Sequence, residues 1–315
     1  RAKIMASSTQ NRQNPAFYAL IGLLIFMSVG PVVLLLANSL KLDVDITSGA
    51  GGLLFMPTIR NYETALCDIL WYEPDHVRFC TIRFGGAFVN SLIIALVSTA
   101  LTLIFGCMAA YALVRFKFMG RDSMSLSTLA VRMIPPAVLL VPVFGLWNNA
   151  FCIDNDGFIG GWIRETFGGR GDVCLAGTHS GIILIYVAMN LPFVIWILQS
   201  FIAQVPRSLE EAARVDGAGP FQVFFMVVLP LIKPGLAAAS IFTFRIAWNE
   251  YLLASALADR DTMTVPILIV NNSSEFDGLG TIMATGMLLA IPPIIFTLFA
   301  SKQIITGMTA GAVKG

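Results

Sequence analysis

The stretch that decides the fold of this chain is SLEEAARVDGAGPFQVFFMVVLPL, Ser208–Leu231. It carries charged side chains and two glycines, yet it lies between two strongly apolar stretches. This contrast predicts a short helical element that stands outside the apolar layers of the molecule.

Composition places the rest of the chain in a membrane. Of 315 residues, 57% are hydrophobic and 12% are charged, and the mean hydropathy is +0.78. Soluble domains contain about 25% charged residues, so lipid must cover part of this apolar surface. A net charge of +1 argues against nucleic acid as a partner. No Gly-x-x-x-x-Gly-Lys-[Ser/Thr] phosphate loop occurs, so the chain does not bind ATP in that way.

Six apolar stretches are long enough to cross a bilayer, which takes about 20 residues each. They predict an all-α integral membrane protein with spans at Phe17–Asn38, Phe84–Val114, Ser123–Asn148, Gly181–Ala203, Gly235–Ala258 and Leu279–Ile305. The tripeptides Ile134-Pro135-Pro136 and Ile291-Pro292-Pro293 predict kinks or breaks in the third and sixth spans.

The distribution of Lys and Arg predicts the orientation of these spans. With six spans, these basic residues of the short loops and ends fall on one side: Arg1, Lys3, Arg12, Arg115, Lys117, Arg121, Arg207, Arg214, Lys233, Lys302 and Lys314. The opposite short loop has Arg260 among Asp259, Asp261, Glu275 and Asp277, and the exceptions Arg78, Arg83, Arg164 and Arg170 lie in longer outside loops, where the rule is weaker. Residues 1–16 are therefore predicted as a cytoplasmic N-terminus and 306–315 as a cytoplasmic tail. Residues 17–305 form the six-helix domain, with a cytoplasmic loop at 204–234.

Four of the five cysteines fall in two predicted outside loops. Two local disulfides, Cys67–Cys80 and Cys152–Cys174, are the preferred interpretation, and other pairings or unlinked thiols are compatible with the sequence. The two histidines, His76 and His179, share those loops, but their spacing to cysteine matches no zinc pattern, so no metal site is predicted.

The first half of the opening stretch has the signals of a short amphipathic helix. Pro206 ends the fourth span, and Ser208 with Glu211 forms a Ser-x-x-Glu capping box. Glu210 and Arg214 are spaced to pair one turn apart. The predicted apolar side consists of Leu209, Ala212, Ala213 and Val215.

The second half has turn signals followed by a second short helix. Asp216-Gly217 ends the first helix, because glycine readily adopts positive φ. Gly219-Pro220 starts the second, because proline suits the first helical position. Pro230 and Pro234 are expected to close it before the fifth span. The residues alone leave two interpretations open, a docking element for another protein and an ordinary surface helix.

The same segment resembles a known family. Glu211-Ala212-Ala213, then Gly217, then Leu229-Pro230 is similar to the "EAA" motif of ABC importer permeases, with Val227 where that motif usually has isoleucine. The stretches RMIPPAVLLVP (Arg132–Pro142), WNEYLLA (Trp248–Ala254) and ITGMTAGAVKG (Ile305–Gly315) resemble the carbohydrate-uptake branch, in particular its smaller, MalG-like permeases of the maltose and glycerol-phosphate type.

The resemblance implies a function and a set of partners. The expected assembly contains a second permease, two copies of a cytoplasmic ATPase that bind ATP and Mg²⁺, and an extracytoplasmic solute-binding protein, in a prokaryotic cytoplasmic membrane. This chain would be a transport subunit without catalytic residues or a cofactor of its own. Residues expected at the ATPase are Glu210, Glu211, Ala212, Ala213, Asp216, Gly217 and Pro230.

Polar side chains at membrane depth are costly and are therefore candidates for the substrate pathway. They are Arg245, Asn249, Glu250, Trp248, Arg132 and Asn190. A cavity holding Arg245 and Arg132 would suit an anionic sugar derivative. Neutral sugars are equally compatible, as are a salt bridge between Arg245 and Glu250 and a substrate site in the partner permease.

Two other classes of membrane protein were weighed. An ion-coupled secondary sugar transporter would need no docking loop, and no inverted repeat is visible between the halves. A membrane enzyme would need a cluster of His, Asp or Glu near one interface, which the two histidines in separate loops do not supply.

Overall fold

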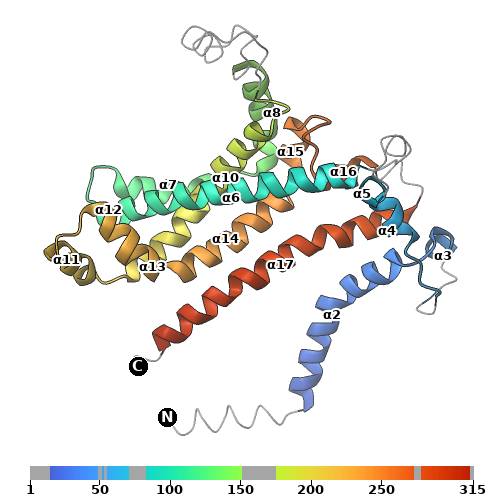
Figure 1. Cartoon of the computed structure of the whole chain (residues 1–315), viewed down its shortest axis with the longest axis horizontal. Coiled ribbons are helices and arrows are strands. Elements are labelled where there is room, and N and C mark those ends of the chain that lie inside the picture. Colours follow the sequence, from blue (N-terminus) through green and yellow to red (C-terminus); the bar gives the residue numbers. More distant parts are fainter. Residues whose placement is uncertain are drawn as a thin grey trace. The chain divides into compact units, whose positions relative to one another are not determined.

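The computed structural model describes residues 15–48, 52, 55–70, 83–150, 175–272 and 278–312. In this part of the chain the secondary structure is helical and contains no strand (Figure 1). The chain divides into two units, one of residues 1–83 and 271–289 and the other of residues 84–270 and 290–315.

The first unit contains α2 (Pro15–Ser39), α3 (Asp43–Ser48), α4 (Arg60–Ala65) and α5 (Cys67–Leu70). Asn61 of α4 joins these pieces, since its amide donates to the carbonyls of Ser39 and Lys41 at 2.9 and 2.7 Å. Asp43 accepts a hydrogen bond from the backbone of Gly280 at 2.8 Å, at the start of α17 (Leu279–Ala312). These bonds satisfy the backbone where α2 ends and α17 begins.

The second unit is built on α6 (Phe84–Arg115), which packs along α10 (His179–Gln204) and α14 (Lys233–Trp248). Around them lie α7 (Arg121–Val131), α8 (Pro136–Gly145), the π-turn η2 (Leu146–Ala150), α15 (Leu252–Leu257) and α16 (Val265–Asn272). A Cβ added at Gly106 of α6 would lie 2.6 Å from Val194 Cγ1 of α10, so only glycine allows this approach.

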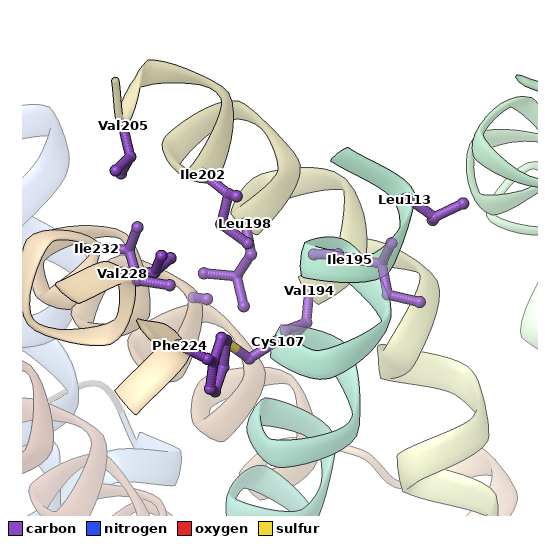
Figure 2. Packing of buried hydrophobic residues seen from close by; sticks show 12 residues of the cluster. Cys107, Leu113, Val194, Ile195, Leu198, Ile202, Val205, Phe224, Val228 and Ile232 are labelled. Atoms are coloured by element: carbon purple, nitrogen blue, oxygen red, sulfur yellow. The ribbon is translucent and has the colours of Figure 1, made fainter. Parts of the chain in front are cut away.

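The core of the second unit gathers apolar side chains from four elements (Figure 2). Val194, Leu198 and Ile202 of α10 meet Cys107 of α6 and Val228, which belongs to the segment after α11. The segment after α11 is therefore packed into the helical core rather than attached as a loose loop.

Four helices are long and apolar enough to cross a membrane: Phe17–Ser39, Phe84–Arg115, His179–Gln204 and Leu279–Gln303. Two further bent pairs pass the same test together, Arg121–Val131 with Pro136–Asn148 and Pro220–Leu231 with Lys233–Trp248, bent by 99° and 74°. The first pair covers the predicted third span, which is therefore a broken helix. The second pair joins the end of the predicted cytoplasmic loop to α14, and the predicted fifth span, Gly235–Ala258, corresponds to α14 followed by a break and α15 (Leu252–Leu257).

The identical Ile-Pro-Pro tripeptides behave differently. In the third stretch Pro135 is extended, with ψ of 134°, and α8 restarts at Pro136. The break follows from proline's bias of the preceding residue toward extended ψ. In the sixth stretch α17 runs through Pro292 and Pro293 without interruption, so the predicted break is absent there.

Candidate functional site: the coupling segment and an arginine pocket

The opening segment folds as α11 (Arg207–Val215), α12 (Pro220–Gln222), the π-turn η3 (Val223–Val228) and α13 (Leu229–Leu231). The predicted capping box at Ser208 is wrong. Helix α11 begins one residue earlier at Arg207, its N-cap is Pro206, and no side chain caps it. Because Ser208 is then already inside the first turn, it does not occupy the N-cap position that the box requires.

The turn after α11 forms as predicted, around Gly217. Its φ is +89°, and its N–H donates to the carbonyl of Arg214 at 3.0 Å. The N–H of Ala218 donates to the carbonyl of Ala213 at 2.9 Å. These two bonds are the Schellman pattern, in which a left-handed residue satisfies the last carbonyls of a helix.

The second short helix also begins where predicted. Gln222 accepts a hydrogen bond from the N–H of Gly219 at 2.8 Å, and Pro220 occupies the first turn. Pro230, however, does not close the helix, which runs on to Leu231 before the 74° bend at Ile232. A proline cannot bond to the carbonyl four residues back, and the preceding π-turn widens the helix where that bond is missing.

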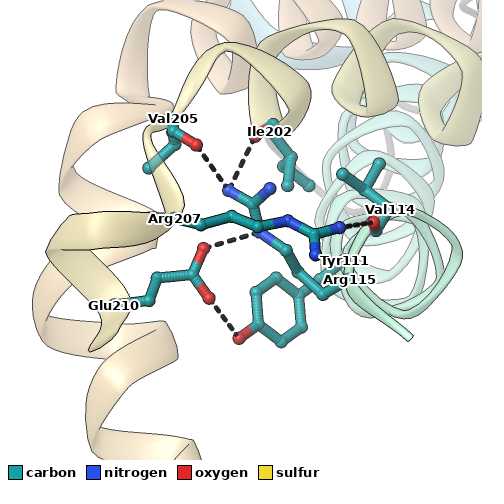
Figure 3. Close-up of polar contacts among 7 residues, drawn as sticks. All are labelled: Tyr111, Val114, Arg115, Ile202, Val205, Arg207 and Glu210. Carbon is teal, nitrogen blue, oxygen red and sulfur yellow. Dashed lines mark hydrogen bonds and ion pairs between the residues drawn. The ribbon is translucent and has the colours of Figure 1, made fainter. Parts of the chain in front are cut away.

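Glu210 fixes the segment to two spans (Figure 3). It is 4% exposed, and its carboxylate forms an ion pair with Arg115 of α6 at 2.5 Å. It also accepts a hydrogen bond from the Tyr111 hydroxyl at 3.1 Å. Arg115 in turn donates to the carbonyls of Ile202 and Val205, at the end of α10, at 3.0 and 2.8 Å. The predicted pairing of Glu210 with Arg214 is therefore wrong, because burial gives Glu210 a closer cation on another helix.

We call Glu210, Arg115 and Tyr111 the clamp. Sequence analysis used Arg115 only as an orientation signal and missed Tyr111. The sequence signal for this pair is the spacing of four residues between Tyr111 and Arg115, which puts both side chains on one face at the end of α6.

Most of the other residues expected at the ATPase face away from the chain. Glu211, Ala212, Asp216 and Gly217 are exposed, and Ala213 is half-buried. Large apolar side chains are exposed beside them: Leu209, Val215, Phe221, Phe225 and Met226. The predicted apolar side of α11 is thus present but uncovered, and the side that packs against the chain is the one that carries Glu210.

Two of the six substrate-pathway candidates meet in one cavity. Arg132, at the break after α7, and Arg245 of α14 line a pocket of about 420 Å³. Sequence analysis missed its other walls, which are Thr128, Leu129, Pro192, Phe193, Trp196, Phe242 and Ile246. The Arg132 guanidinium stacks over the Phe193 ring, 4.2 Å from its centroid.

The other four candidates have structural roles. Asn190 is buried and donates to the Tyr186 carbonyl at 2.9 Å. Trp248 is 1% exposed and stacks against Phe244, so it cannot lie against a sugar. Both residues are buried in this structure, and neither lines the pocket that holds Arg132 and Arg245.

Asn249 and Glu250 lie in the break between α14 and α15, not on the continuous helix that was predicted. The amide of Asn249 donates to the carbonyl of Arg245 at 2.9 Å. Glu250 caps α15 by accepting the N–H groups of Leu253 and Ala254 at 2.9 and 3.0 Å. Its carboxylate is thereby engaged at a helix start, and the alternative of a salt bridge between Glu250 and Arg245 is not the arrangement in this structure.

The predicted disulfides fall largely outside the described residues. Cys80, Cys152 and Cys174 lie there, as does His76, while Cys67 belongs to α5. His179 lies beside Asn90, with Nε2 2.8 Å from the amide oxygen. No group of three or more His, Cys, Asp or Glu suited to a metal occurs among the described residues.

Comparison with known proteins places these features in one family. Residues 102–308 match the family described as the binding-protein-dependent transport system inner membrane component. The chain is 36% identical to the trehalose transport system permease protein SugB of Mycobacterium tuberculosis over 74% of this chain and 78% of that protein. It is 30% identical to the trehalose/maltose transport system permease protein MalG of Thermococcus litoralis over 83% of each.

A solved structure shares the fold. It is a bacterial ABC transporter involved in the import of the acidic polysaccharide alginate, with a TM-score of 0.62, 21% identity, and coverage of 91% of this chain and 94% of that one. With more than half of its length matched, the chain belongs to the inner-membrane permease subunits of binding-protein-dependent ABC importers, in the branch that transports sugars.

Proposed function

We propose that this chain is one of two permease subunits of a sugar importer that is driven by two copies of a separate ATPase. An extracytoplasmic solute-binding protein would deliver a sugar or sugar derivative to it. ATP and Mg²⁺ would bind to the ATPase, because this chain has no phosphate loop.

The observation that carries this proposal is the two-sided attachment of α11. On one side the clamp ties α11 to the ends of α6 and α10. On the other side Val215, Phe221 and Met226 are between 72% and 87% exposed, without cover from this chain. Large apolar surfaces left open beside a fixed element are typical of protein interfaces.

This arrangement suggests how movement is passed on. When the ATPase subunits close, they displace α11, and the clamp transfers that displacement to α6 and α10 together. The spans then shift between outward-open and inward-open states. The ATPase drives the change only because it contacts α11 differently in the two states.

The alternative of an ion-coupled secondary transporter leaves the exposed surface of α11–η3 without a purpose. Such a transporter would need ionisable or polar groups in its spans, but half-buried Glu250 and buried Asn190 have structural partners here.

Co-purification tests the proposal. The tagged chain, co-expressed with the second permease and the ATPase, should retain both after extraction in mild detergent. Phe221→Asp should lose the ATPase and keep the second permease, because it places a charge in the apolar surface. Phe118→Asp, an exposed apolar residue on the loop before α7, is the matched control and should keep both. Recovery of the two permeases without ATPase from the unmodified complex would refute the proposal.

A further inference from the structure

The pocket between α7, α10 and α14 combines two cations with aromatic walls. Arg132 and Arg245 supply the charge, and Phe193, Trp196 and Phe242 supply the rings. We infer that this pocket binds the anionic group of a sugar derivative, a carboxylate or phosphate, during its passage. The inference rests on the proposed function, because it requires that the pocket lie on the transport path.

The pocket lies midway along its helices, on a face of the chain where both arginines are exposed. Pro192 and Phe193 are midway along the 26-residue α10, a helix about 40 Å long at 1.5 Å per residue. An arginine at that depth is expensive in lipid, so it must face protein, water or a ligand.

Neither guanidinium group has an anionic partner among the described residues. Within the described part of the chain, no carboxylate lies within ion-pairing distance of Arg132 or Arg245, and neither side chain donates a hydrogen bond. Glu250, the nearest acidic residue in sequence to Arg245, is engaged at the start of α15. An anion that enters the pocket would therefore meet two guanidinium groups that have no ion-pair partner among the described residues.

The chemistry of the pocket favours a ligand over a carboxylate of the second permease. A cavity of about 420 Å³ is within the size range of small-molecule sites, whereas a single carboxylate would fill little of it. The Arg132 guanidinium lies over the Phe193 ring, 4.2 Å from its centroid, and a guanidinium group can bind an oxyanion through two parallel N–H groups. The exposed ring of Trp196 offers a flat apolar surface of the kind that packs against a sugar ring.

The experiment uses the full complex with its binding protein in proteoliposomes. The probes are pairs of a neutral sugar and its acidic derivative: glucose and glucuronate, galactose and galacturonate, trehalose and trehalose 6-phosphate. ATP-dependent uptake and stimulation of ATPase activity are measured for each. We expect the acidic member of one pair to be transported in preference to the neutral one.

The variants then locate the charge recognition. Arg132→Gln and Arg245→Gln should each raise the concentration needed for half-maximal uptake by about ten- to a hundredfold, the usual effect of losing a hydrogen bond between charged groups. Arg245→Lys should recover part of the loss. Lys117→Gln, an exposed cation outside the pocket, is the control and should leave uptake unchanged.

Two outcomes overturn the inference. Uptake of a neutral sugar that is indifferent to both glutamine variants would exclude the anion site and leave the importer function intact. Loss of the second permease from purified Arg245→Gln complexes would assign the arginine to a pairing between subunits. By contrast, an unmodified complex without an ATPase would contradict the proposed function itself.

Discussion

At the scale of single residues, two adjacent glutamates have opposite environments. Glu210 is buried against Arg115 and Tyr111, whereas Glu211 is exposed. The letters of the sequence do not distinguish them, because both fall in the first turns of a short helix. What distinguishes them is the position of Arg115, which comes from a helix almost a hundred residues earlier in the chain.

This difference yields a prediction for Glu210→Gln. Removing one partner of a buried ion pair leaves the other charge uncompensated, which costs about 3 kcal/mol or more. The detergent-solubilised permease should therefore denature at a lower temperature and couple ATP hydrolysis poorly to uptake. Glu211→Gln, the exposed neighbour, should leave the denaturation temperature unchanged. Equal shifts for the two variants would show that the clamp does not stabilise the fold.

At the scale of elements, much of the architecture was predictable. The boundaries of α2, α6 and α10 differ by at most two residues from the predicted spans, because long apolar runs mark them directly. Breaks were harder to predict. The Ile-Pro-Pro at 134–136 breaks its helix, whereas the same tripeptide at 291–293 does not. The tripeptide at 134–136 follows the exposed residues Arg132 and Met133. The tripeptide at 291–293 is flanked by apolar residues within a long helix.

The site was predictable to a similar degree. The high free-energy cost of a charged side chain inside the bilayer marked Arg132 and Arg245 as candidates, and the structure places both in one pocket. The same argument failed for Asn190 and Glu250, because it cannot tell a polar group with a local backbone partner from one without. The aromatic walls of the pocket carried no signal, since aromatic residues are frequent throughout the spans.

The turn at Gly217 gives a prediction at this scale. A Cβ there would have nothing within 4 Å, so any harm from a substitution comes from the backbone at φ +89°. Valine resists positive φ, whereas asparagine tolerates it. Gly217→Val should insert in the membrane at normal levels yet lose ATP-driven uptake, and Gly217→Asn should retain most of it. Normal uptake by a well-expressed Gly217→Val protein would contradict a coupling role for this turn.

At the scale of the whole molecule, the distribution of Lys and Arg predicts that both ends of the chain lie in the cytoplasm. A fluorescent protein fused after Gly315 should fluoresce, and alkaline phosphatase fused there should be inactive. Alkaline phosphatase fused after Leu70, in the predicted first outside loop, is the control and should be active. Phosphatase activity at the C-terminus would mean that one of the bent pairs does not cross the membrane.

The position of the clamp also sets how far the distant end of α6 moves for a given movement at the clamp. Arg115 stands at the last residue of α6, a helix of 32 residues, which is about 48 Å long at 1.5 Å per residue. If the clamp acts as the pivot of a rigid lever, a tilt of only about 5° there would swing the far end by about 4 Å. Because Arg115 also bonds the end of α10, α6 and α10 would tilt about the same point. A small stroke at the ATPase would thus become a gate-sized movement at the opposite face.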